Sequence, residues 1–362
     1  MSGSIGSVGT GYGFLNTLIT NTSTVHQQLD NLTEQASSGL VAQTYAGLGS
    51  SAPVPLDLNP QLTALQTYQN NISQATGTMQ VTQTAMTQLQ QIAATFVADM
   101  PDLTSANTQE IDSIAQQAQA ALQQVAGLLD TQDGDVYVFG GQDTSNPPVP
   151  SPDSILTSGF YTQINAAVSG LATNGAAATA ASTLAIASSN AFGTSPFSTY
   201  MSQPASDIGQ QVVQTGDGTT VNIGLLASAN SNVTSTGTST TGSYMRDLMR
   251  ALATIGSMSS SQANDSGFVA LVQDTTTSLN GIVTAMAGDV GVLGNTQSSL
   301  TSTGTQLSDT TTALTGQVSA VQDADMATTL SNISAIQTQL QASYRLIATE
   351  GTLSLANFLP VP

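Results

Sequence analysis

The chain has 362 residues, enough for two or three domains, and a formal net charge of −19 from 22 acidic residues and three basic ones. It contains no Lys, and its basic residues are Arg246, Arg250 and Arg345. With no basic cluster to neutralise phosphate groups, nucleic acid and anionic membrane are not expected as partners. The absence of Cys excludes disulfides and thiolate chemistry.

Charged residues make up only 7% of the chain, so it does not have the composition of an acidic disordered tail. We therefore expect a surface covered by Ser, Thr, Gln and Asn. No apolar run is long enough to cross a bilayer. The N-terminal segment lacks the basic and apolar regions of a Sec-type signal, so any export is expected to use a specialised route.

The first predicted helix spans about residues 14–37 and ends at Ser38–Gly39, a helix stop signal. Its apolar residues alternate between spacings of three and four, which is typical of a helix that packs one stripe against a partner helix. No partner follows directly in the sequence, so helices from the two chain ends are expected to pair with each other and with other copies. The predicted stripe consists of Leu18, Val25, Leu29 and Leu32.

Two more helices are predicted in the first third of the chain. After a Gly- and Pro-rich stretch, one helix is expected to begin at Asn59–Pro60, because Pro is tolerated in a first turn, and to end near residue 100. The next is expected over residues 108–130, and a short strand over 136–139, bounded by Gly134 and Gly140.

Residues 150–243 change in composition to mostly Ser, Thr, Gly, Ala and Asn. The pattern indicates a helix over 158–173 and a β-hairpin that turns at 216–218. We interpret the segment as a small mixed domain inserted between helical rods. A disordered linker is the alternative on composition.

Three helices are predicted in the last third of the chain, over about residues 244–258, 266–322 and 326–358. Gly351 is expected to interrupt the final one. The longest carries a strict seven-residue apolar repeat, the signature of a helix that keeps one seam against a partner. This rod seam is Leu279, Met286, Leu293, Leu300, Leu307, Leu314 and Val321. The last helix is expected to add a self-assembly stripe formed by Leu330, Ile333, Leu340, Tyr344, Ile347 and Phe358.

No catalytic, metal or cofactor site is predicted. His26 is the only histidine, and the acidic cluster at residues 130–135 lacks the spacing of a calcium loop. Arg246 and Arg250 lie one helical turn apart and are candidates for ion pairs between subunits, with local surface pairing as the alternative. Arg345 is a third candidate, if the last helix becomes covered in an assembly.

Three stretches resemble the bacterial flagellin family, which includes the hook-filament junction protein. They are LDNLTEQASSGLVAQTYAGLG near the first stripe, DVYVFGGQDTSNPPV before the insert, and the C-terminal DADMATTLSNISAIQTQLQASYRLIATEGTLSLANFL. The resemblance covers about residues 14–148 and 244–359. It implies a non-enzymatic, mainly α protein in which helices from both termini form a long antiparallel rod with a small α+β insert.

The resemblance also implies a domain plan. The N-terminal polymerisation helix would occupy 1–40, the rod 41–149 and 244–322, the surface-exposed insert 150–243, and the C-terminal polymerisation helix 323–362. Such a subunit is exported unfolded by a type III route, assembles with copies of itself into the extracellular flagellum, and meets junction proteins, cap proteins and an export chaperone that holds its C-terminal helix. The filament subunit is the first hypothesis and the junction protein the second. A coiled-coil effector or adhesin comes next, and an enzyme housed in the insert is less favoured still.

Overall fold

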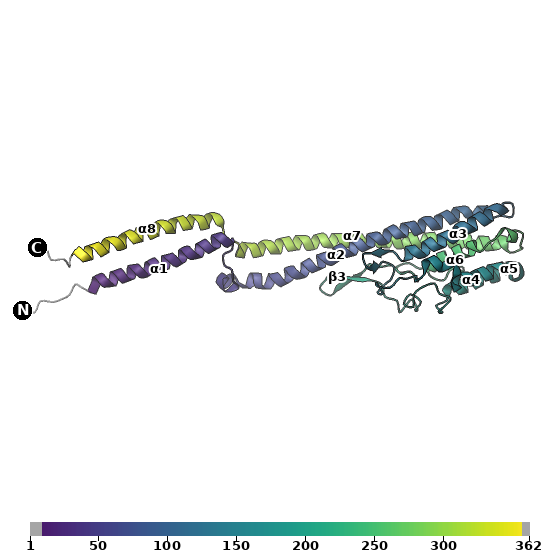
Figure 1. Ribbon diagram of the computed structural model, residues 1–362, viewed down its shortest axis with the longest axis horizontal. Helices are drawn as coiled ribbons and strands as arrows, with labels where there is room; N and C mark the ends of the chain where they lie inside the picture. The colour runs from purple at the N-terminus through teal and green to yellow at the C-terminus, as the bar shows by residue number, and fades with distance from the viewer. Residues whose placement is uncertain (1–8, 357–362) are drawn as a thin grey trace, which may run out of the picture. The chain divides into compact units, whose positions relative to one another are not determined.

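The computed structural model describes the backbone of residues 9–356 and the side chains of residues 16–349. The chain forms two compact units: unit 1 is built from residues 1–66 and 309–362, and unit 2 from residues 67–308. The described residues are mainly helical, with two small antiparallel sheets (Figure 1). This is the mainly α fold with a small α+β insert that the sequence predicts.

Unit 1 contains α1 (Gly9–Ser38) and α8 (Met326–Ala356), which lie side by side (Figure 1). The first helix ends where its stop signal predicts, because Gly39 adopts φ 72°, a left-handed conformation that favours glycine. A short 3₁₀ helix, η1 (Tyr45–Ser51), follows. The expected interruption at Gly351 is not seen, since α8 continues through it to Ala356.

The second long helix, α2 (Pro53–Asp99), begins earlier than predicted. Pro53 and Pro55 lie in its first turn, where backbone N–H groups need no partner within the helix. Pro60 is therefore inside the helix instead of at its start. It removes the N–H that would otherwise donate to the Leu56 carbonyl, a loss that the rest of the helix absorbs.

Unit 2 is a bundle around two long helices. Gly294 of α7 (Phe268–Gln322) faces Gln83 of α2, and Gly304 faces Ile72. As one residue number rises the other falls, so these helices run antiparallel. The remaining helices are η2 (Met100–Asp102), α3 (Thr108–Leu129), η3 (Pro152–Thr157), α4 (Gly159–Ser169), α5 (Leu171–Ser188), α6 (Tyr244–Gly256) and η4 (Ser260–Gln262).

Two hairpins make up the β structure. The first pairs β1 (Gln132–Asp133) with β2 (Val136–Tyr137), so the predicted strand at 136–139 is shorter than expected. The second pairs β3 (Val212–Gly216) with β4 (Thr219–Asn222). Its turn contains Gly218 at φ 64°, which confirms the hairpin that the sequence predicts there.

The insert is ordered and packs into unit 2, which rules out the disordered-linker interpretation. The helix predicted over 158–173 corresponds to α4, which ends earlier than predicted, at Gly170. The next helix, α5, was not predicted. Its sequence is dominated by Ala, Ser and Thr, so no apolar stripe marks it. It contacts α4 and α6.

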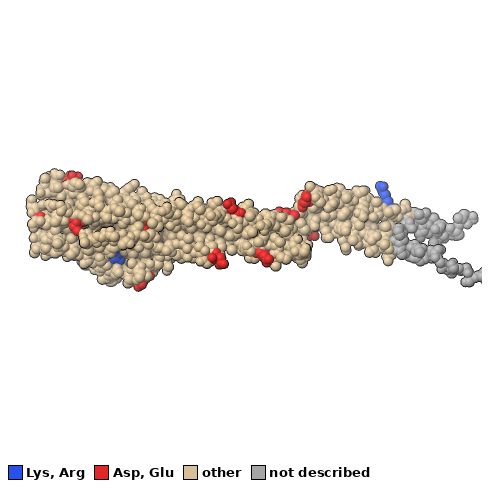
Figure 2. All heavy atoms as spheres, turned by 180° about the vertical axis from the view of Figure 1, so that it is seen from behind, with Lys and Arg blue, Asp and Glu red and all other residues tan. Residues whose placement is uncertain are grey.

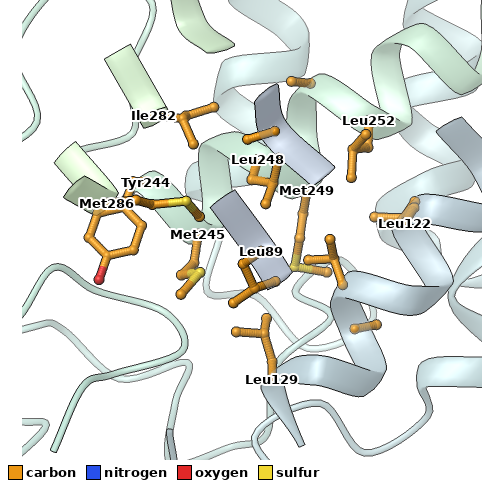
Figure 3. Packing of buried hydrophobic residues seen from close by; sticks show 14 of the residues in the cluster. Leu89, Leu122, Leu129, Tyr244, Met245, Leu248, Met249, Leu252, Ile282 and Met286 are labelled. Carbon is orange, nitrogen blue, oxygen red and sulfur yellow. The ribbon is translucent and has the colours of Figure 1, made fainter. Parts of the chain in front are cut away.

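The core of unit 2 surrounds α6, whose every residue is buried. Figure 3 shows side chains from α2, α3, α6 and α7 meeting in this core. The labelled residues are Leu89, Leu122, Leu129, Tyr244, Met245, Leu248, Met249, Leu252, Ile282 and Met286. A helix buried on all sides needs apolar neighbours all round, and here three other helices supply them.

Asp130 ends α3 inside this unit and accepts a hydrogen bond from the Val149 N–H at 2.8 Å. Burial raises the pKa of this carboxyl from 3.8 to about 6, although the hydrogen bond acts in the opposite direction. Between about pH 4 and pH 6 the Asp130 carboxyl is therefore protonated in the folded chain and ionised in the unfolded chain. The stability contributed by this group falls as the pH rises through that window.

We expect Asp130→Asn to stabilise unit 2 by roughly 1–2 kcal/mol at pH 7, after allowing for partial solvent screening, and to change little at pH 4. The amide oxygen keeps the bond from Val149 but carries no buried charge. Urea unfolding at both pH values measures the difference, with the exposed Asp135→Asn as control. An equal effect of Asp130→Asn at both pH values would contradict the role of the charge.

Candidate self-assembly surface

The stripe predicted on α1 is half-covered. Its side chains are intermediate in exposure, and Thr22 between them is buried. On α8 the matching side contains buried Leu340 and half-buried Ile333 and Ile347. The α1 positions recur with the alternating three-four spacing of helix pairs, the α8 positions recur every seven residues with half-buried Ile336 and Ser343 between them, and α1 and α8 contact each other. Part of each predicted stripe therefore packs against the other terminal helix of the same chain.

A backbone clasp holds this pair at one end; we use the name for residues 39–41 together with residues 322–324. Leu40 and Asp323 form an antiparallel β-bridge. The Val41 N–H donates to the Gln322 carbonyl at 2.7 Å, and the Ala324 N–H donates to the Gly39 carbonyl at 2.8 Å. Since these bonds join fixed residues, the clasp sets the register between α1 and α8.

Asp325 caps the start of α8 directly after the clasp. Its carboxylate accepts hydrogen bonds from the N–H groups of Ala327 and Thr328, at 3.0 and 3.2 Å, and from the Thr328 hydroxyl. These bonds, above all the one from the Thr328 N–H, lower the pKa of the Asp325 carboxyl. The ionised cap satisfies orphan N–H donors and suits the positive end of the helix dipole.

The pair leaves large apolar side chains on its outside. Leu330 and Tyr344, both in the predicted stripe, are 53% and 49% exposed. Phe358 lies outside the described residues. Ile19, Met326 and Leu346 are exposed as well, although they lie outside the predicted stripes. We call Ile19, Met326, Leu330, Tyr344 and Leu346 together the outer apolar face; they are exposed on more than one side of the pair, since Tyr344 and Leu346, two positions apart, point to opposite sides of α8.

Unit 1 has little interior of its own. Apart from Pro55, its buried apolar side chains among the described residues are Leu48, Val318 and Leu340. The other buried apolar side chains belong to unit 2. Most of the helical surface in unit 1 is therefore not covered by the chain itself.

The rod seam on α7 has its first four residues fully buried. These are Leu279, Met286, Leu293 and Leu300, which belong to the core of unit 2. Leu307, Leu314 and Val321 are half-buried. The seven-residue repeat thus faces the chain's own helices over the part that lies in unit 2.

The structure corrects the expectation for two of the arginines. Arg246 is buried and donates to the carbonyls of Ser228 and Ala187 at 2.7 and 3.0 Å, and to the Asn190 Oδ1 at 2.7 Å. Its guanidinium also lies 5.0 Å from the ring centre of Phe197. It therefore binds inside unit 2 and is not free to pair with a second subunit.

Arg250 is likewise buried, 3.8 Å from Asp274, and donates to the Ser239 carbonyl and the Ser278 hydroxyl. Burial lowers the pKa of both guanidinium groups. The spacing of the two arginines alone predicted a surface position for them. It gives no sign that α6 is buried on all sides. Arg345, by contrast, is exposed on α8.

The surface is poor in charge. On the face shown in Figure 2, acidic and basic residues are few and scattered among neutral ones. Among the described residues, no group of three or more His, Cys, Asp or Glu side chains could hold a metal ion. Within the same part of the chain, no helix has both the length and the apolar content that a membrane span requires.

Two regions of the chain, which contain the paired terminal helices, match models of a known protein family. Residues 13–144 match the bacterial flagellin N-terminal helical region, and residues 276–359 match the bacterial flagellin C-terminal helical region. The chain belongs to the bacterial flagellin family. A search of curated proteins found no match. The flagellin matches contain α1, α2, α3 and α8 almost entirely, together with most of α7.

The matched regions leave residues 145–275 outside, which include α4, α5, the second hairpin and α6. The buried arginines are therefore in the part of this flagellin that the family models do not match. Flagellins are structural proteins that assemble into helical polymers. Within this family the outer apolar face is the candidate surface for contact between copies.

Arg246→Met should lower the stability of the isolated chain by roughly 2–4 kcal/mol, because it leaves buried carbonyl oxygens without donors. Its hydrogen-bond partners are neutral and the neighbouring Asp247 is buried from the solvent, so the loss should be similar at low and high salt. Urea unfolding measures it, and the exposed Arg345→Met serves as control. A normal isolated chain combined with a defect only in assembly would contradict this internal role.

Proposed function

We propose that this flagellin is the repeating subunit of the flagellar filament and that it polymerises through α1 and α8. The observation that supports this most strongly is the contrast between the two units. Unit 2 has a deep core, whereas unit 1 pairs two long helices over a half-covered stripe and exposes an outer apolar face. Exposed apolar surface of this kind is typical of an interaction site.

The polymer supplies what the single chain lacks. Isolated helices are marginal in water, and most helix stability in proteins comes from packing of an apolar face. Neighbouring copies would cover the outer apolar face and stabilise the α1–α8 pair. We further propose, from the family resemblance, that the subunit works outside the cell, adjoins junction and cap proteins in the flagellum, and is held by an export chaperone at α8.

The junction protein between hook and filament is the alternative function. Two segments favour it, because the PPV at residues 147–149 and the QASYRLI at residues 341–347 resemble that relative. A filament subunit adds to its own polymer without limit, whereas a junction subunit forms a short layer. The length of the assembly therefore separates the two functions.

Purified chain incubated with sheared filament seeds should elongate them into long tubes of this one protein, seen by electron microscopy. Short caps of fixed length on the seeds would favour the junction protein. A soluble oligomer that leaves the seeds unchanged would contradict both functions.

The variant Leu330→Ser/Tyr344→Ser should raise the critical concentration for elongation roughly a hundredfold, since full burial of a large apolar side chain contributes about 1.5–3 kcal/mol and about half of each side chain is already covered in the single chain. Sedimentation of polymer from monomer measures this concentration. Val269→Ser removes a similarly exposed apolar side chain of α7 and should have a smaller effect. Elongation of the double variant at the unaltered concentration would count against the outer apolar face.

A further inference from the structure

Arg345 is the one exposed Lys or Arg side chain among residues 16–349. The chain has no Lys, and both Arg246 and Arg250 are buried. Copies of a chain with a net charge of −19 repel one another. A single exposed cation is therefore the place where a second copy can be attracted by charge.

Arg345 lies on the side of α8 that faces away from α1. It is two positions from both Ser343 and Ile347, which are half-buried on the α1 side. Two residues turn an α-helix by about 200°, so a side chain two positions away in either direction points to the opposite side. Tyr344 and Leu346 flank Arg345 and are also exposed.

The outward side of α1 carries two carboxylates. Glu34 is exposed and lies two positions from both Leu32 and Ala36, which are half-buried, so it faces away from α8 by the same geometry. Asp30, one turn earlier, has a side chain 75% exposed and lies 4.0 Å from His26, which is charged only if protonated. One guanidinium can reach either carboxylate of a pair at this spacing.

The register set by the clasp keeps these groups apart within one chain. Leu40 is opposite Asp323, so Arg345 is level with about Leu18 of the antiparallel α1. With a rise of 1.5 Å per residue, Asp30 and Glu34 lie roughly 18 and 24 Å farther along the axis. They are also on the other side of the helix pair. An ion pair within one chain is thus excluded by both distance and direction.

We propose that the outward side of α8 around Arg345 docks on the outward side of α1 around Asp30 and Glu34 in a second copy, displaced along the helix axis by roughly 18–24 Å. The proposal rests on the proposed polymerisation and specifies its contact. Two different surfaces meet, so the contact is heterologous and each copy can bind one neighbour on each side. Such a contact extends into an open helical polymer.

Charge reversal with compensation tests this contact. Arg345→Glu should raise the critical concentration for seeded elongation about tenfold, because attraction becomes repulsion between the copies. Adding Glu34→Arg or Asp30→Arg to Arg345→Glu should bring it back to within about twofold of the unaltered chain. Adding Asp57→Arg, an exposed carboxylate on α2, should not restore it. Circular dichroism of each variant verifies that the helical content is unchanged.

The outcomes separate the inference from the function on which it rests. If the unaltered chain fails to elongate seeds, the proposed function fails and the contact fails with it. If the unaltered chain elongates and Arg345→Glu elongates equally well, the contact alone is overturned. The contact is also overturned if Arg345→Glu is defective and only Asp57→Arg, or none of the three compensating changes, restores elongation.

Discussion

The antiparallel contact between α1 and α8 joins the two ends of the chain, and the proposed assembly of this flagellin depends on it. The contact is made through a half-covered stripe, and the clasp at residues 39–41 and 322–324 fixes its register. Because the stripe occupies only one side of each helix, the outward sides stay available to other copies. The pair buries few apolar side chains in a single chain, so under the proposed function neighbours favour assembly by adding the burial that it lacks.

Unit 2, in contrast to unit 1, buries its apolar side chains within the single chain. Its central helix α6 is buried on every side, even though it contains Arg246, Asp247 and Arg250. The charges are tolerated because hydrogen bonds with neighbouring segments satisfy their polar atoms, except the Arg250 Nε; Asp247, for example, accepts bonds from Thr240 and Thr241. Buried charges of this kind stabilise little by themselves, but they fix the loops that bind them. The core of unit 2 is therefore formed by residues of this chain alone.

The long helices could be predicted from the sequence because their apolar residues follow helical spacing, as in α3 and along the seam from Leu279 to Leu300. The hairpin at Gly218 was also predictable, since its turn requires a glycine. α5 could not be predicted, because Ala, Ser and Thr do not distinguish a buried side from an exposed one. The burial of Arg246 and three members of the outer apolar face, Ile19, Met326 and Leu346, were missed for a related reason: spacing identifies a stripe but not which partner covers it.

Hydrogen exchange tests the central claim most directly, namely that unit 2 is stable alone whereas α1 and α8 need neighbouring copies. Amide exchange should be measured by mass spectrometry on the dilute isolated chain and on the assembled polymer. The account predicts slow exchange in α6 in both samples, but rapid exchange in α1 and α8 that slows by orders of magnitude only in the polymer. Equal, strong protection of α1, α8 and α6 in the isolated chain would contradict it.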